Sequence, residues 1–275
     1  MTLLVRDEED VLRENIIYHL SQGIDHIIVT DNLSVDSSPE IIHEFVKQGV
    51  ATYISETDDN YNQSIWVSRM AQMVYEAGAD WVIHCDADEF WLPPDGCDLK
   101  KWLGKLRWSN IIYADRHDFI CLPSDNLPFW ERMIYRKKVS LNSLGKPLPP
   151  KVTHKAYPNV TVAQGNHAVK GIRFSRAKKS GLEIMHFPLR SREQYLRKIR
   201  NGGAAYANNK ELSVSVGNTW RKQYEELQST GTIRFVEENL YSYKQLKQQL
   251  DSGEILEDRR LRNLFKKIAH ASSRT

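Results

Sequence analysis

The sequence lacks an apolar run long enough to cross a membrane, and its first residues do not follow the pattern of a signal peptide. It holds only three cysteines in 275 residues, Cys85, Cys97 and Cys121, and none of them has the CxxC spacing of a metal site. An odd number of scattered cysteines favours free thiols in a reducing compartment. We therefore expect a cytoplasmic protein, with peripheral contact at a membrane surface as the further possibility.

An excess of one charge is also missing. The chain has 38 basic and 35 acidic residues, a formal net charge of +3, which is too balanced to favour a nucleic-acid partner. There is no internal repeat and no low-complexity segment. The basic segment Arg259–Lys267 is typical of a solvated helix face, and contact with an anionic membrane surface is the alternative.

The first hundred residues alternate between short apolar runs and amphipathic segments. The apolar runs at 3–5, 27–30, 50–56 and 80–85 predict strands, and the segments at 8–23, 38–49 and 62–78 predict helices. This alternation indicates an α/β fold with a mostly parallel sheet flanked by helices. After Leu92 the pattern indicates mixed strands, and from Ser191 it returns to helices. We expect a catalytic domain at 1–190 and a helical extension at 191–275.

Acidic turns follow three of the predicted strands, and ligands of open α/β sheets bind at the carboxyl ends of strands. The third turn lies within "WVIHCDADEFW", where crowded carboxylates beside bulky apolar residues require a positive partner. Asp86 and Asp88 are two residues apart, so an extended segment would point both to one face. Two oxygen donors on one face suit Mg²⁺ or Mn²⁺. The alternative is a surface turn whose acids only aid solubility.

"DADEFW", together with "LLVRDEEDVLRENIIYHLSQGIDHIIVTDNLSVDSSPEII" before it, resembles the family 2 glycosyltransferases of the GT-A fold. The resemblance is to the family-2-like subgroup related to the family 92 enzymes. It covers residues 3–91 and resumes at 164–169 and 185–202. The chain departs from the family pattern at Leu33, where the turn usually has glycine.

The resemblance implies a nucleotide-diphosphate sugar donor, UDP-linked, and a divalent cation, Mn²⁺ or Mg²⁺. Arg190, where the next predicted helix begins, is a further candidate for contact with the diphosphate. The residues that the resemblance places at the donor are Val5, Arg6 and Asp7 for the base and ribose, Asp31 for the base, Arg69 for the phosphates or base, and Asp86 for the ribose or a metal-bound water. The metal ligands it implies are Asp86, Asp88 and His186. For Arg69 the alternative is an ordinary solvent-facing helix arginine, and for His186 it is a strand-end histidine bonded to backbone.

An inverting transfer also needs a base that takes the proton of the acceptor hydroxyl. The main candidates are Asp118, Glu89 and His167. Asp115 and Glu131 are further candidates, and for the loop and strand residues a plain structural role is equally compatible with the sequence.

The prediction is therefore a metal-dependent inverting glycosyltransferase of the hexosyltransferase class, EC 2.4. Its acceptor would be a hydroxyl of a glycan or lipid-linked molecule, as in polysaccharide biosynthesis, and nucleic acid is not expected as a partner. The alternatives are a metal-dependent phosphohydrolase, a nucleotidyltransferase and a non-catalytic nucleotide-sugar-binding protein. A phosphohydrolase normally has its DxD on the first strand, and a nucleotidyltransferase normally has a glycine-rich basic loop where this chain has "LVRDEED".

Overall fold

The computed structural model describes residues 1–60, 62–94, 96–122, 127–142, 145–209, 212–213 and 216–272. The chain forms two compact units, each made from two stretches of sequence. Unit 1 holds Met1–Arg116 and Pro149–Ile184, and unit 2 holds His117–Leu148 and Met185–Thr275. This partition differs from a single boundary at residue 190, and whether residues 191–275 act as a separate extension stays a prediction.

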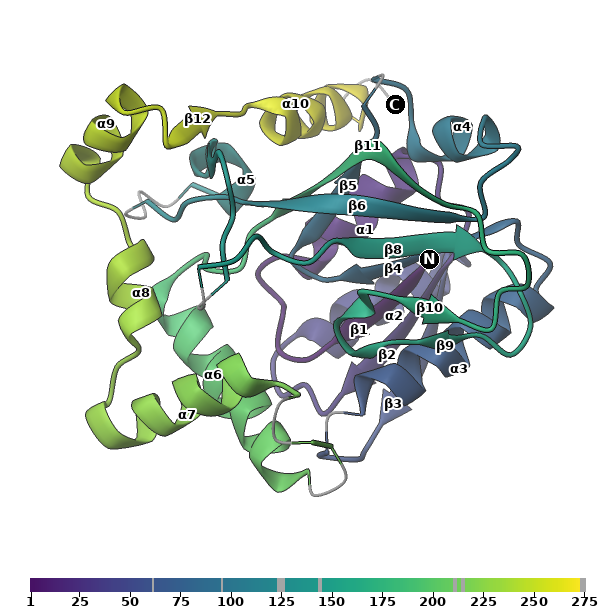
Figure 1. The fold of residues 1–275 in the computed structure, drawn as a ribbon, viewed down its shortest axis with the longest axis horizontal. Coiled ribbons are helices and arrows are strands. Elements are labelled where there is room, and N and C mark those ends of the chain that lie inside the picture. The colour runs from purple at the N-terminus through teal and green to yellow at the C-terminus, as the bar shows by residue number, and fades with distance from the viewer. Residues whose placement is uncertain are drawn as a thin grey trace. The chain divides into compact units, whose positions relative to one another are not determined.

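Unit 1 is built around a large sheet (Figure 1). Its elements are β1 (Thr2–Val5), α1 (Leu12–Ser21), β2 (Ile27–Asn32), α2 (Ser38–Lys47), β3 (Ala51–Glu56), α3 (Gln63–Glu76), β4 (Trp81–Asp86), β5 (Glu89–Leu92), α4 (Leu99–Gly104), β6 (Ile111–Asp118), β8 (Lys151–Lys155), β9 (Thr161–Val162), the 3₁₀ turn η1 (Gln164–Asn166), β10 (Val169–Lys170) and β11 (Ala177–His186). The last residues of β6 and β11 belong to unit 2.

The sheet has the strand order β3-β2-β1-β4-β8-β6-β11-β5. The strands β3, β2, β1 and β4 are mutually parallel, and β8 is antiparallel to both of its neighbours. Val5 of β1 is level with Asp31 of β2, and Leu4 is level with Asp86 of β4. The predicted α/β class, a sheet of parallel and mixed strands flanked by helices, is confirmed, and its register brings Asp31 and Asp86 to the same edge on either side of β1.

One face of the parallel strands is covered by α3. Val67, Met70, Ala71 and Val74 follow one another at helical spacing and form a buried cluster whose sheet side includes Ile28 and Val82. Val160 and Val162, from the segment around β9, belong to the same cluster. The helix thus begins beside the carboxyl edge of the sheet, which places Gln63 near the acidic turns.

Unit 2 is mainly helical. Its elements are α5 (Phe129–Arg132), β7 (Tyr135–Lys137), α6 (Arg192–Asn208), α7 (Asn218–Thr230), α8 (Arg234–Asn239), α9 (Tyr243–Asp251), β12 (Ile255–Glu257) and α10 (Arg260–Ser272). Figure 1 shows α6 and α7 side by side, and β12 pairs antiparallel with β7. None of the described helices combines the length and apolarity needed to cross a membrane. The three cysteines are free thiols, as expected.

Two helices of unit 2 differ from the sequence prediction. The sequence pattern over 236–253 is typical of one continuous helix, but in the structure helix α8 ends at Asn239 and a new helix, α9, begins at Tyr243, where Ser242 and Gln245 form a capping box. Helix α7 was not predicted, because its apolar residues are too few to give a clear stripe. It contacts α6 closely: a Cβ added at Gly202 would lie 2.5 Å from the ring of Trp220.

Candidate functional site

The turns that follow β1 and β2 are tied to each other. The backbone amide of Asp7 donates to the hydroxyl of Ser34 (2.9 Å), and the Asp7 carboxylate accepts from the amide of Val35 (2.8 Å). The amide of Glu8 donates to the Ser38 hydroxyl at the start of α2. Asp7 is buried and has a φ of +55°. Its carboxylate therefore shapes the turn, and its contact with a donor stays a prediction.

Leu33 occupies the turn position at which a glycine was expected. Its φ is +59°, in the left-handed region that glycine adopts without steric cost. The turn therefore keeps a glycine-like backbone conformation even though it has a leucine side chain.

Asp31 is the next-to-last residue of β2, and only 4% of it is exposed. Its Oδ2 accepts a hydrogen bond from the Tyr53 hydroxyl (3.2 Å). Its Oδ1 is buried and has no hydrogen-bond partner among the described residues. Burial raises the pKa of this carboxyl against the opposing effect of the Ser34 and Tyr53 hydroxyls. The arrangement leaves one acceptor oxygen at the carboxyl edge of the sheet that a donor group would satisfy.

The two arginines predicted at the donor both lie near this edge, and both form ion pairs. Arg6 contacts Asp59 at 2.6 Å, and its side chain is 17% exposed. Arg69 contacts Glu56 at 3.0 Å. The chain thus provides an acidic partner for each, so a bound phosphate would have to compete with a carboxylate. Val5 is buried at the end of β1.

The turn between β4 and β5 differs from the expected extended segment. β4 ends at Asp86, Ala87 and Asp88 form a turn, and β5 begins at Glu89. The expectation that Asp86 and Asp88 share one face of an extended segment is therefore wrong, because Asp88 lies in a turn outside the strand. Asp88 is 3% exposed, and it belongs to no group of three or more His, Cys, Asp or Glu side chains that could hold a metal among the described residues.

The side chain of Asn15 in α1 forms hydrogen bonds to this turn. Its buried side-chain amide donates to the carbonyl oxygens of Ala87 (2.9 Å) and Glu89 (2.8 Å). One turn further along the helix, the Tyr18 hydroxyl donates to the carbonyl of Trp91 (2.8 Å). Nothing in the sequence singled out Asn15, because an asparagine inside an amphipathic helix has no functional spacing of its own.

The positive partner of the acidic turn is a lysine. The ammonium of Lys151, the first residue of β8, lies 2.5 Å from Asp86 Oδ2 and 3.2 Å from Glu89 Oε1. Arg116 of β6 adds a second cation 3.7 Å from Glu89. Burial lowers the pKa of Lys151, but the negative charges of Asp86 and Glu89 raise it by more, so its pKa lies above the usual value. Sequence reasoning missed Lys151 because it stands 65 residues from Asp86.

Amide groups and His167 complete the cluster. Asp86 Oδ1 accepts from Asn166 (3.1 Å) and Gln63 (3.4 Å). His167 Nδ1 donates to the carbonyl of Pro150 (2.9 Å), since a carbonyl can only accept, and Nε2 is therefore an acceptor. Burial, and then the charges of Lys151 and Arg116, lower the pKa of His167 to about 4. At neutral pH the ring is uncharged.

These contacts fit a divalent ion poorly. No group of three or more His, Cys, Asp or Glu side chains that could hold a metal exists among the described residues. Both carboxylate oxygens of Asp86 already accept hydrogen bonds, and one of them accepts from an ammonium. A Mg²⁺ ion would need to approach such an oxygen to about 2.1 Å. The donor set of Asp86 therefore does not match the ligand role that the resemblance implies.

The remaining predicted residues belong to unit 2. His186 Nδ1 donates to Asp118 Oδ1 (2.7 Å), so these two candidates form a hydrogen-bonded pair. The amide of Asp118 donates to the Ser140 hydroxyl (2.7 Å). Arg190 is 1% exposed, and its guanidinium donates to the carbonyl of Phe187 (2.9 Å). The roles proposed for His186 as a metal ligand and for Arg190 at the diphosphate stay predictions.

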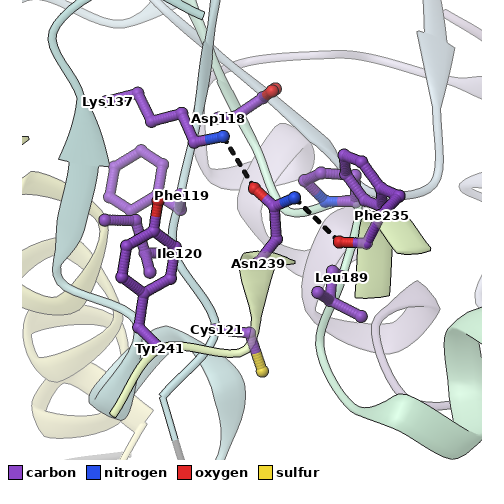
Figure 2. A pocket seen from close by; sticks show the side chains of 10 residues that line it. Asp118, Phe119, Ile120, Cys121, Lys137, Leu189, Phe235, Asn239 and Tyr241 are labelled. Carbon is purple, nitrogen blue, oxygen red and sulfur yellow. Dashed lines mark hydrogen bonds between the residues drawn. The ribbon is translucent and has the colours of Figure 1, made fainter. Parts of the chain in front are cut away.

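A cavity lies beside Asp118 in unit 2 (Figure 2). Lys137 donates to Asn239 there (2.7 Å), and Asn239 donates to the carbonyl of Phe235 (2.8 Å). Its volume of about 10 Å³ suits one water molecule and no sugar.

Unit 1 also has a cavity of about 920 Å³ at the amino ends of the parallel strands. It lies beside His26, Asp80 and Trp81, near the starts of β2 and β4. Ligands of open α/β sheets bind at the carboxyl ends, so this cavity is not assigned to the donor.

The chain was also compared with known proteins. No family model matches it, and no curated protein sequence matches it. Among solved structures, S. aureus TarS 1–349 in complex with UDP-GlcNAc is 11% identical over 84% of this chain and 72% of that chain, with a TM-score of 0.36. The complex of TarS 1–349 with UDP is 10% identical over 82% and 70%, with a TM-score of 0.37. HddC from Yersinia pseudotuberculosis is 12% identical over 67% and 75%, with a TM-score of 0.30. Likenesses this distant carry no conclusion about what this chain binds.

Proposed function

We propose that this protein is a glycosyltransferase of GT-A type that uses a nucleotide-diphosphate sugar, with UDP as the nucleotide. The observation that carries the proposal is the buried, unpartnered Oδ1 of Asp31 at the carboxyl edge of the sheet. A uracil ring has an N–H that would donate to such an oxygen, and leaving a buried acceptor unpaired is costly. Asp86 lies at the same edge on the other side of β1, where the ribose would follow.

The proposed reaction inverts the anomeric centre. The oxygen of the acceptor hydroxyl forms a bond to the anomeric carbon while the bond from that carbon to the diphosphate oxygen breaks, and the diphosphate leaves with the electron pair. A base takes the hydroxyl proton. His167 is the candidate that best suits this role in unit 1, because its Nε2 is an acceptor on a ring held by Pro150.

The other two candidates have different surroundings. Glu89 is fully buried and contacts Lys151 and Arg116, which leaves it poorly placed to take a proton from an acceptor. Asp118 is paired with His186, and that pair has the composition of a general base whose carboxylate orients the ring. Asp118 therefore remains the alternative base, to be compared with His167 by mutation.

The proposed acceptor is a hydroxyl of a glycan or a lipid-linked molecule. The basic helix α10 supplies a peripheral contact with an anionic membrane surface in this proposal, and its Lys266 lies 3.8 Å from Glu131. A cytoplasmic location and the exclusion of nucleic acid remain predictions from composition. The Mn²⁺ or Mg²⁺ implied by the resemblance also remains a prediction, and no step above depends on it.

The test is a panel of nucleotide-sugars incubated with the protein in Mn²⁺ and in EDTA, with release of nucleoside diphosphate and the thermal shift as readouts. We expect one UDP-sugar to raise the melting temperature and to release UDP. Pyrophosphate formation from a nucleoside triphosphate and a sugar phosphate would indicate a nucleotidyltransferase instead. Phosphate release from a phosphomonoester would indicate a phosphohydrolase, and a thermal shift without turnover would indicate a binding protein.

A further inference from the structure

The strand β8 inserts a cation into the acidic turn. It runs antiparallel between β4 and β6, and its first residue, Lys151, is 1% exposed. The Lys151 ammonium reaches both Asp86 and Glu89, and Arg116 of the next strand reaches Glu89 from β6. The two cations and the two carboxylates that they contact balance in charge.

We propose that Lys151, supported by Arg116, takes the place of the divalent cation, so that donor binding and sugar transfer by this chain are independent of metal. The inference rests on the proposed function. It assigns Lys151 a positioning role: the ammonium acts through Asp86 and does not touch the donor.

The geometry excludes shared occupancy of Asp86. A Mg²⁺ ion would lie about 2.1 Å from its carboxylate oxygen, while the Lys151 ammonium already lies 2.5 Å from Oδ2. Two cations on one carboxylate oxygen repel each other, and the Lys151 side chain is only 1% exposed, so water screens its ammonium weakly. On Oδ1 an ion would meet the amide hydrogens of Asn166 and Gln63. A metal could enter only if Lys151 left its pocket.

The electrostatic consequence concerns the leaving diphosphate. Carboxylates without a counter-charge at the end of β4 would repel a diphosphate at this edge of the sheet. Lys151 and Arg116 cancel that repulsion permanently, because they are part of the sheet. Both Asp86 and Glu89 can then remain ionised whether or not a donor is bound.

The test measures metal binding directly, by electron paramagnetic resonance of added Mn²⁺ and by the melting temperature in Mn²⁺ and in EDTA. We expect no stoichiometric Mn²⁺ site in the natural protein and the same melting temperature in both solutions. Lys151→Ser opens space beside two carboxylates, and we expect this variant to gain a Mn²⁺ site and a Mn²⁺-dependent rise in melting temperature. Lys155→Ser is the matched control on the same strand, and it should gain neither.

A second variant, which preserves the charge balance, serves as the control for folding. If Lys151→Ser does not fold without metal, Lys151→Met combined with Glu89→Gln removes one charge of each sign, and we expect it to fold and to show no Mn²⁺ site. We expect the natural protein to bind UDP in EDTA and the double variant not to bind it, because the double variant lacks the ammonium that positions Asp86. Lys151→Arg should keep UDP affinity in EDTA.

Turnover separates this inference from the function beneath it. UDP release from a productive donor that is unchanged by EDTA supports the inference. Release that EDTA abolishes, or a stoichiometric Mn²⁺ site in the natural protein that Asp86→Asn removes, overturns the inference and leaves the glycosyltransferase proposal standing. If no nucleotide-sugar binds or reacts in either solution, the proposed function fails, and this inference fails with it.

Discussion

At the scale of single residues, Asp31 gives the most direct test of donor binding. Asp31→Asn exchanges the acceptor Oδ1 for a group that no longer carries a charge, and we expect UDP affinity to fall roughly 10- to 100-fold, the value of a charged hydrogen bond. Calorimetry with free UDP measures this. Asp25→Asn, in the segment just before the same strand, is the control and should bind UDP normally. Equal affinity in the two variants would remove Asp31 from the base site.

The same substitution has the opposite effect on stability. Burial raises the pKa of Asp31 above its unfolded value, so the contribution of this carboxyl is most favourable at low pH and is lost as the pH rises through the folded pKa. At pH 7 the ionised group therefore destabilises the ligand-free protein. We expect Asp31→Asn to raise the melting temperature without UDP, and a lower value would show that the carboxylate is well paired.

At the scale of elements, Asn15 provides the hydrogen bonds that connect α1 to the β4–β5 turn. Asn15→Ala leaves the carbonyl of Ala87 without this donor and leaves that of Glu89 with only the weak Cys85 thiol donor, which costs about 1–3 kcal/mol in the free energy of unfolding. Urea unfolding measures the loss. Arg13→Ala, two positions away, removes an exposed ion pair with Glu44 and should cost about 0.2–1 kcal/mol. If both variants unfold at the same urea concentration, the Asn15 hydrogen bonds do not stabilise the fold.

The turn after β2 offers a second test at this scale. Leu33 has a φ of +59°, which is unfavourable for a leucine by about 1–2 kcal/mol, while glycine loses about 1 kcal/mol of chain entropy. We therefore expect Leu33→Gly to be neutral or stabilising by up to about 1 kcal/mol. Leu33→Val should be destabilising, because a β-branched residue tolerates positive φ less well. A Val variant as stable as the natural protein would mean that the turn relaxes.

At the scale of the whole molecule, buried neutral histidines of unit 1 set the response to acid. Burial lowers the pKa of His19 to about 3 and that of His167 to about 4, and it also lowers the pKa of His84 and His154. The pKa of a histidine in the unfolded chain is near 6.5. At a pH below that value, each of these histidines therefore gains a proton when the chain unfolds.

Stability should accordingly be complete above pH 6.5 and should fall as the pH drops toward 4, by up to about 1.4 kcal/mol per pH unit for each histidine. Urea unfolding at a series of pH values gives the slope. His84→Gln should reduce that slope, whereas His26→Gln, at an exposed position, should leave it unchanged. Stability that is flat between pH 5 and 7 would contradict the protonation states inferred here.

The sequence predicted the part of the site that depends on local pattern. The strands ending at Val5, Asn32 and Asp86 are buried apolar runs followed by acids, so the acidic edge of the sheet was readable. Lys151 was not, because β8 enters between β4 and β6 from far along the chain, and no local periodicity records which strand a lysine will meet. The sequence showed that the acids needed a cation, and only the antiparallel pairing identified it.

The long separation between Asp86 and Lys151 also affects the order of events on the ribosome. The acidic turn is synthesised 65 residues before its lysine, an interval of roughly 3–13 s at ordinary rates of translation. During that time β4 has no β8 at its side, and Asp86 lacks the ammonium that it contacts in the complete structure. A translation product that stops short of residue 151 would contain Asp86 without the ammonium that contacts it in the complete structure.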